Sequence, residues 1–391
     1  MALLIDAYRE LNSKKLFWIT MILSGVVVAA FAAIGINENG LTLLWYEIGD
    51  FNGFMTSATV PPDQLYKLLF ANFGITFWLS WIATILALVS TSSMIPDFIA
   101  SGAIELTLSK PIGRLRLFLT KFVMGLLFVG LQVLTFSAAC FVVIGVRGGA
   151  WEPGVFLAVP VVLLFFSYLF SVCVLFGLLT RSTIASLLLT LLFWFVCFGI
   201  NATEVIILNG RESNAVLADS LQTRIGRMEA NTTRLLRPPP GDASTDPTVP
   251  SDPRAPLTPE ELNEANPRLV EARSDLAKLR KNYEPWDTAA KVFVAAKTVL
   301  PKTAETVDLI DRWLVKEMDL SGLDGDDEAD ANPNADAPAF ARLSRTEREK
   351  VTRRLDKIYK TRSVAWVVGT SLLFELVVLG LAARMFVRRD F

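Results

Sequence analysis

The sequence predicts an all-α integral membrane protein with six transmembrane helices and a large, partly disordered helical insert between the fifth and the sixth. Three observations lead to this fold class. The chain of 391 residues is 52% hydrophobic and has a positive mean hydropathy, which is high for a soluble domain. Its apolar residues gather in stretches of about 20, the length that a helix needs to cross a bilayer. Its charged residues gather between Asn209 and Lys360, so the rest is more apolar than the average.

Each predicted span meets the length and hydropathy criteria for a transmembrane helix. The spans are approximately Leu16–Ile36, Phe73–Ile95, Leu117–Ile144, Val155–Leu179, Ile184–Ala202 and Val364–Phe386. Small residues such as Gly125, Gly130 and Ser167 recur in them, and small residues let membrane helices pack closely. The first span follows Lys14 and Lys15 like a signal peptide, but it is longer than a signal core, so we interpret it as an anchor.

Lysine and arginine predict the orientation of the spans. The loops that would share one side hold Arg9, Lys14, Lys15, Lys110, Arg114, Arg116, Lys121, Arg181, Arg384, Arg388 and Arg389. The opposite loops, 37–72 and 145–154, hold far fewer cations. The positive-inside rule therefore predicts that both termini of this multi-pass cell-membrane protein lie in the cytoplasm. The basic stretch Arg342–Arg362 opposes this assignment, although long loops cross a membrane largely regardless of charge.

The same patterns divide the chain into three parts. These are residues 1–207 with the first five spans and a cytoplasmic loop at 96–114, residues 208–361 with an extracytoplasmic helical insert, and residues 362–391 with the sixth span and a cytoplasmic tail. Within the insert, residues 237–257 and 321–338 are too polar to bury a core, so we predict disordered linkers there. Helix starts are predicted from Thr258-Pro-Glu-Glu261, Asn266-Pro267, Thr303 and the capping box Ser344-x-x-Glu347.

Catalytic chemistry finds little support in the composition. The chain has no histidine, which removes the commonest general base and the commonest transition-metal ligand. Cys140, Cys173 and Cys197 lie in apolar runs without metal-like spacing, and no GxxxxGK[ST] phosphate loop is present. The formal net charge of −1 does not indicate nucleic-acid binding. We therefore predict no catalytic residue, no metal site and no cofactor.

Glu375 is the only acidic residue deep inside a predicted span. An ionisable side chain at that depth is a functional hypothesis by default. The alternative is a carboxyl group that is paired by a neighbouring helix or by water, and both interpretations stay open here.

The most informative segment is the cytoplasmic loop after the second span. Pro96 is predicted to end that span, and a short amphipathic turn follows with Ile104 and Leu108 on one face. Lys110-Pro111 then breaks the turn. Physically, this is a short knob suited to docking a partner.

This loop resembles that of ABC-2 type permeases. The run Ser101-Gly-Ala-Ile-Glu-Leu-Thr-Leu-Ser-Lys-Pro-Ile-Gly-Arg114 is similar to their pattern, approximately G-x-x-E-x-L-L-S-x-P-x-x-R. Three weaker resemblances accompany it. Tyr8–Lys15 resembles the amphipathic elbow helix of the family, Leu300–Thr306 its outer-face helical segment, and Met385–Phe391 its Arg-Arg-Asp tail. The long insert departs from compact family members.

The resemblance implies the transmembrane subunit of an ABC exporter. Such a chain forms a homodimer or a heterodimer of permeases in the membrane lipid and engages a separate ABC ATP-binding subunit, which hydrolyses the ATP. By position, the coupling helix and its flank would be formed by Gly102, Glu105, Leu108, Lys110, Pro111 and Arg114. The substrate is not implied.

Other classes of function were weighed. The main alternative is a non-transporting polytopic membrane protein whose outer segment binds a partner or acts as a scaffold. An ion-coupled carrier would predict inverted sequence halves and paired intramembrane charges, and the sequence shows neither. Co-purification with an ATP-binding protein would separate the exporter from the main alternative.

Overall fold

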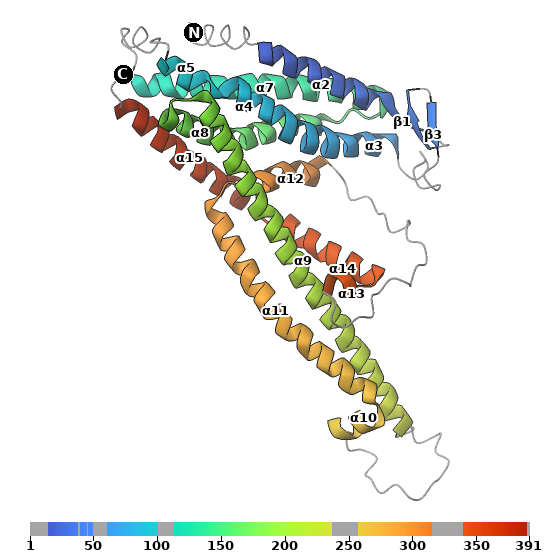
Figure 1. The fold of residues 1–391 in the computed structure, drawn as a ribbon. Helices are drawn as coiled ribbons and strands as arrows, with labels where there is room; N and C mark the ends of the chain where they lie inside the picture. Colours follow the sequence, from blue (N-terminus) through green and yellow to red (C-terminus); the bar gives the residue numbers. More distant parts are fainter. Residues whose placement is uncertain are drawn as a thin grey trace, which may run out of the picture. The chain divides into compact units, whose positions relative to one another are not determined.

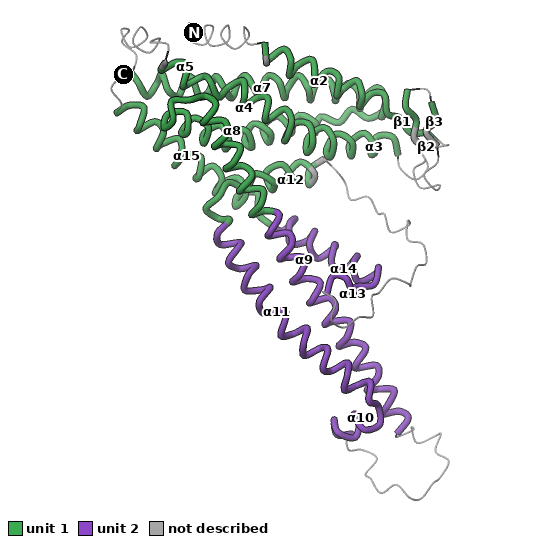
Figure 2. The backbone as a smooth tube through the Cα atoms, viewed as in Figure 1, with its two compact units in different colours: residues 1–201, 297–324, 362–391 green, residues 202–296, 325–361 purple. Residues whose placement is uncertain are grey.

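The computed structural model describes residues 15–37, 40–44, 46–49, 61–100, 113–236, 257–314 and 339–388. Nearly all of the described regular structure is helical (Figure 1), which confirms the all-α class. The chain forms two compact units (Figure 2). Unit 1 comprises Met1–Asn201, Lys297–Asp324 and Arg362–Phe391, and unit 2 comprises Ala202–Ala296 and Gly325–Thr361.

Unit 1 is a helical bundle around α8. Its described helices are α2 (Lys15–Ala33), α3 (Pro62–Leu69), the π-helix η1 (Phe70–Ala83), α4 (Thr84–Ser92), α5 (Met94–Ala100), α7 (Arg114–Arg147), the 3-10 helix η2 (Pro153–Leu157), α8 (Ala158–Thr180), the first part of α9 (Thr183–Leu236), α12 (Thr303–Leu314) and α15 (Val364–Arg388). Helix α8 packs against α7, α12 and α15. Its Phe166 and Leu169 are fully buried, so α8 forms the centre of the core.

Five described helical segments are long and apolar enough to cross a membrane. They are Pro62–Ile99, Arg114–Arg147, Pro153–Thr180, Thr183–Leu236 and Val364–Arg388. They contain the second to sixth predicted spans, whereas the first predicted span falls in a shorter apolar helix, Phe17–Ala33. The sequence patterns and these helices together are those of a multi-pass membrane protein. The count of six spans stays a prediction.

Large apolar side chains lie exposed at helical spacing on the surface of unit 1. On α9, Ile184, Leu188 and Phe195 are exposed, and on α2 Trp18 and Ile22 are exposed. A soluble protein rarely exposes contiguous apolar surface of this kind, whereas a helix in lipid requires it. These faces therefore fit contact with membrane lipid.

Close helix packing in the bundle depends on glycine at one position. A Cβ atom on Gly125 of α7 would lie 2.6 Å from Cε1 of Phe170 on α8. The Phe170 ring is buried and stacks against Phe122 and Phe166, so it has little room to move. By contrast, a Cβ atom on Gly130 would lie 3.4 Å from Leu163.

We therefore expect Gly125→Ala to lower the free energy of unfolding by about 1–3 kcal/mol, the usual cost of overpacking a core. The matched variant Gly130→Ala is expected to be neutral or to stabilise by up to about 1 kcal/mol, because alanine has the higher helix propensity. Thermal unfolding of the two variants in the same detergent checks this. Equal midpoints would contradict the packing described.

A small antiparallel sheet follows α2 in unit 1. It contains β1 (Ile34–Asn37), β2 (Gly40–Leu43) and β3 (Tyr46–Gly49), in that order. Ile34 pairs with Leu43, and Gly40 has a φ of 122°, a conformation that favours glycine. From the sequence, residues 37–72 are expected to form a loop, so these strands are not predicted by it. The last residues of the predicted first span, up to Ile36, thus belong to β1 rather than to a helix.

Unit 2 is built on a helical hairpin. Its helices are α9 from Ala202 onward, α10 (Pro259–Ala265), α11 (Pro267–Val299) up to Ala296, α13 (Ala339–Arg342) and α14 (Arg345–Thr361). Helices α9 and α11 lie side by side and antiparallel (Figures 1 and 2). Along the hairpin, three apolar clusters pair Leu208 with Ala290, Leu217 with Leu279, and Ile225 with Leu269. Helix α14 joins the second cluster through Val351.

The helix starts predicted within the insert have clear outcomes. Thr258 and Glu261 form the reciprocal capping box of α10, and α11 begins at Pro267. Thr303 is the first residue of α12 rather than its cap. At α14, the backbone N–H of Ser344 donates to the Glu347 carboxylate at 2.9 Å, which is one half of the predicted capping box. The predicted linkers 237–257 and 321–338 lie outside the described residues, except for residue 257.

The Glu347 carboxyl gives unit 2 a pH dependence. Burial raises its pKa, but hydrogen bonds from Ser220 and Ser344 and the nearby Lys350 outweigh that effect, so the pKa is lowered from 4.5. The folded state then binds fewer protons than the unfolded state. The stabilisation is complete above the unfolded pKa, near 4.5, and is lost as the pH falls through the folded value.

Glu347→Gln is accordingly expected to raise the rate of amide hydrogen exchange in α14 at pH 7. The difference from the parent chain should shrink progressively below about pH 4.5. Hydrogen–deuterium exchange of α14, corrected for the intrinsic pH dependence of exchange, measures it. A difference that stays constant between pH 7 and pH 3 would contradict the assignment.

Candidate functional site

Most of the predicted coupling residues lie outside the described residues. These are Gly102, Glu105, Leu108, Lys110 and Pro111. Arg114 is described: it is the first residue of α7, and its Nη1 donates a hydrogen bond to the carbonyl oxygen of Val387 on α15 at 3.2 Å. The start of α7 therefore meets the end of α15.

Other contacts bring further segments to this end of unit 1. Lys121 Nζ on α7 lies 5.1 Å from the ring centroid of Phe98 on α5. The Thr183 hydroxyl at the start of α9 donates to the Asp97 carboxylate on α5 at 3.5 Å. These contacts bring together the end of α5, the starts of α7 and α9 and the end of α15. Helices α5 and α7 are the described elements on either side of the segment 101–112. Several of the cations predicted to share one side lie on these segments.

Glu375 lies near the middle of the 25-residue helix α15 and is buried. The hydroxyl of Ser167 on α8 donates a hydrogen bond to its Oε2 atom at 2.9 Å. The carboxyl group is therefore held by a neighbouring helix within the core of unit 1. Such a cross-helix hydrogen bond satisfies a polar group that lipid could not.

Glu375 belongs to a polar face of α15. Ser371 precedes it by four residues, which places both side chains on the same side of the helix, whereas Trp366 and Thr370 lie on a different side. The Ser371 hydroxyl accepts a hydrogen bond from the backbone N–H of Lys302 at 2.9 Å, just before α12. This face of α15 is thus tied to α8 through Ser167 and to the start of α12 through Lys302.

Lys302 is a fully buried lysine in unit 1. Its ammonium group donates to the Thr370 hydroxyl and to the carbonyl oxygen of Lys297, the latter at 3.3 Å. The nitrogen also lies 4.2 Å from the ring centroid of Trp366, in cation–π geometry. Burying a charge is costly unless it is paired and hydrogen bonded, and these contacts supply part of that compensation.

Glu305 forms the centre of a buried ion cluster on α12. Its side chain is 4% exposed and accepts hydrogen bonds from Lys297 Nζ at 2.5 Å and from Arg362 Nη1 at 2.9 Å. Lys297 Nζ also donates to the side-chain oxygen of Asn201 at 2.6 Å. Arg312 Nη1 donates to the carbonyl oxygen of Arg362 at 3.0 Å. We call Lys297, Glu305 and Arg362 the Glu305 cluster.

The Glu305 cluster joins residues at which the chain passes between unit 1 and unit 2. Asn201, Lys297 and Arg362 are the unit 1 residues that flank three of the four boundaries with unit 2. All three are joined directly or through one side chain to Glu305. The cluster therefore fixes these three points of the membrane bundle relative to one another and to α12.

The sequence analysis found Glu375 but not this cluster. Lys297 carries no signal of its own in the sequence, and Arg362 stands there only as the last cation of the basic stretch Arg342–Arg362. One signal was present: the segment Leu300–Thr306, which contains both Lys302 and Glu305, carried one of the weaker resemblances.

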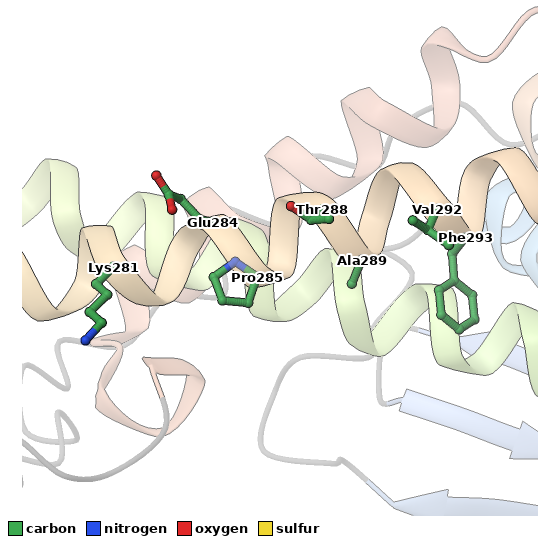
Figure 3. A pocket seen from close by; sticks show the side chains of 7 residues that line it. All are labelled: Lys281, Glu284, Pro285, Thr288, Ala289, Val292 and Phe293. Carbon is green, nitrogen blue, oxygen red and sulfur yellow. The ribbon is translucent and has the colours of Figure 1, made fainter.

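A surface depression lies beside α11 in unit 2. Pro285 sits inside the helix, and a depression of about 740 Å³ runs beside it (Figure 3). The residues that line it, among them Lys281, Thr288 and Phe293, all belong to α11. Because a single helix supplies the whole lining, the depression brings no separate chemical groups together.

Metal binding finds no support within the described ranges. They contain no group of three or more His, Cys, Asp or Glu side chains that could hold a metal ion. Cys140, Cys173 and Cys197 are buried and free.

Comparison with known proteins yields no relative. The chain matches no protein-family model, and no significant match was found among curated proteins or solved structures.

Proposed function

We propose that this chain is the transmembrane permease subunit of an ATP-driven exporter of the ABC-2 type. In this proposal six helices span the membrane, with α2 as the first of them. The substrate moves across the bilayer within a dimer of such subunits, and a separate ATP-binding subunit hydrolyses ATP. Both termini and the segment 96–114 face the cytoplasm, and unit 2 faces outward. The first residues of that segment are predicted to follow the end of the second span at Pro96, but they form the last part of helix α5.

The observation that carries the proposal is the gathering of segments around Arg114. The segment 101–112, whose sequence resembles the coupling loop of the family, begins and ends where α5, α7 and α15 meet. A force applied to that segment would act on the first residues of α7 and the last residues of α15 together. This is the arrangement that a docking partner needs to move a helical bundle as a body.

The polar face of α15 supplies the second element of the proposal. Helix α15 is connected to the start of α7 through the hydrogen bond between Val387 and Arg114. It is also connected to α8 through Glu375 and to the start of α12 through Ser371. Side-chain hydrogen bonds across membrane helices are worth about 0.6–2 kcal/mol each, so they can break and re-form during a transport cycle. We therefore infer that α15 shifts along α8 when the ATP-binding subunits close.

The proposal is tested by affinity purification of the full chain from its own membranes in a mild detergent. An ATP-binding subunit that carries a phosphate loop should co-purify in near-stoichiometric amount. A sample in which Ser101–Arg114 is replaced by a glycine–serine linker of equal length provides the control and should lose the subunit. Absence of any ATP-binding protein from the intact sample would instead favour the non-transporting scaffold.

A further inference from the structure

Unit 2 contains a pocket that is separate from the membrane bundle. It lies between α9, α11 and the turn from α13 to α14, and its volume is about 650 Å³. This is within the range of pockets that bind small molecules, roughly 300–1,000 Å³. Unlike the depression beside Pro285, it is lined by residues from several helices.

The lining combines an apolar wall with arginines. Leu217, Leu221 and Met228 of α9 supply apolar surface. Arg224 of α9, Arg268 of α11 and Arg342 of α13 supply guanidinium groups. Three arginines from three helices thus converge on one pocket beside an apolar wall.

The acidic residues of the pocket are largely committed to structural roles. Asp275 pairs with Arg342 at 3.8 Å and with Lys278 at 3.4 Å. Glu347 accepts hydrogen bonds from the backbone and the hydroxyl of Ser344 at the start of α14. Neither carboxylate forms an ion pair with Arg224 or Arg268 in the described part of the chain.

Two arginines at the pocket are left for a ligand. Arg224 and Arg268 are exposed and form no ion pair with any of the described residues. Glu271, which also lines the pocket, likewise forms no ion pair within the described part of the chain. Over the whole lining, the charges of three arginines and three carboxylates sum to zero, so an anionic ligand would be attracted by the two unpaired guanidinium groups rather than by a net positive charge.

We propose that this pocket binds an anionic amphiphile, a molecule with a phosphate or carboxylate group next to an apolar chain. The planar guanidinium group presents paired N–H donors that match the oxygens of a phosphate or a carboxylate. The apolar wall along α9 would take the chain of the ligand, where burial removes its surface from water. The inference concerns unit 2 alone and goes beyond the proposed permease function.

Octyl phosphate is the probe that tests the pocket, with uncharged octanol as its matched partner. The full chain is placed in nanodiscs of zwitterionic lipid, and binding is measured by isothermal titration against empty nanodiscs. Octyl phosphate should bind with a saturable heat beyond that of the empty discs, whereas octanol should show partition only. The double variant Arg224→Gln/Arg268→Gln should bind octyl phosphate roughly tenfold more weakly or worse, because charge-assisted hydrogen bonds are lost.

The control variant is Arg227→Gln, which removes an exposed arginine from the same helix outside the pocket lining. It should bind like the parent chain, and unfolding midpoints verify that every variant is folded. A repeat in nanodiscs that contain phosphatidic acid separates two sources of the ligand. Competition there identifies a lipid headgroup, and its absence identifies a free amphiphile. Equal binding by the folded double variant, or no saturable binding by the parent chain, would overturn the proposal.

Discussion

Replacing Glu305 with alanine is expected to lower the free energy of unfolding by about 3–5 kcal/mol. The carboxylate is almost completely buried and accepts hydrogen bonds from both Lys297 and Arg362. Removing it leaves two cations in a buried site without the anion between them. Breaking a buried ion cluster by deleting one partner is far more costly than deleting an exposed pair, because the remaining charge keeps its desolvation cost.

Thermal or denaturant unfolding of the full chain in one detergent measures this effect. The matched control is Glu349→Ala, which deletes the carboxylate of the exposed pair with Arg353 on α14 and should cost about 1 kcal/mol or less. Glu305→Gln keeps an oxygen acceptor without the charge and should fall between the two. If Glu305→Ala proved no more damaging than Glu349→Ala, the Glu305 cluster would not be the buried link described above.

The second large effect is expected in the predicted coupling loop. Glu105→Arg, or Pro111→Ala, should reduce the stimulation of ATP hydrolysis by this chain to near the basal rate of the ATP-binding subunit. The first change reverses the charge on the predicted docking turn, and the second removes the proline that is predicted to end this turn. The expected effect is on coupling, because both residues belong to the predicted cytoplasmic loop.

ATP turnover by the purified complex checks this prediction, and the unfolding midpoint of each variant verifies folding. Glu264→Arg, the same charge reversal at an exposed site in unit 2, is the control and should leave stimulation unchanged. Full stimulation by both loop variants would remove the loop from the mechanism.

The membrane helices could be predicted from the sequence because their signal is local. Five of the predicted stretches lie within helices long and apolar enough to span a bilayer. The exact ends were harder. The first apolar stretch continues to Ile36, but the backbone leaves the helix after Ala33 and pairs as β1 with β2. Hydropathy alone cannot separate the end of an apolar helix from a short apolar strand.

The length of α9 shows a second limit of hydropathy. The predicted span ended at Ala202, where polar residues begin, yet the helix continues to Leu236. No proline interrupts the sequence from Thr183 to Leu236, and Pro238 follows soon after. Proline placement therefore gives the end of this helix better than polarity does.

The residues of the candidate site also differ in whether the sequence alone indicates them. Glu375 stands out because it is a single acid in an apolar stretch. The Glu305 cluster does not, because Lys297, Glu305 and Arg362 are separated in the sequence and come together only through the packing of α12 and α15 on α8. Charges that are buried by tertiary contacts look like solvated charges when each segment is considered alone.

The central claim, that an ATP-binding partner drives this membrane bundle, is tested most directly by one rate. ATP hydrolysis by the purified ATP-binding subunit is measured alone and after reconstitution with this chain in nanodiscs. The account predicts a higher rate in the presence of the chain. The same rate with and without the chain, in a complex shown to be assembled, would contradict it.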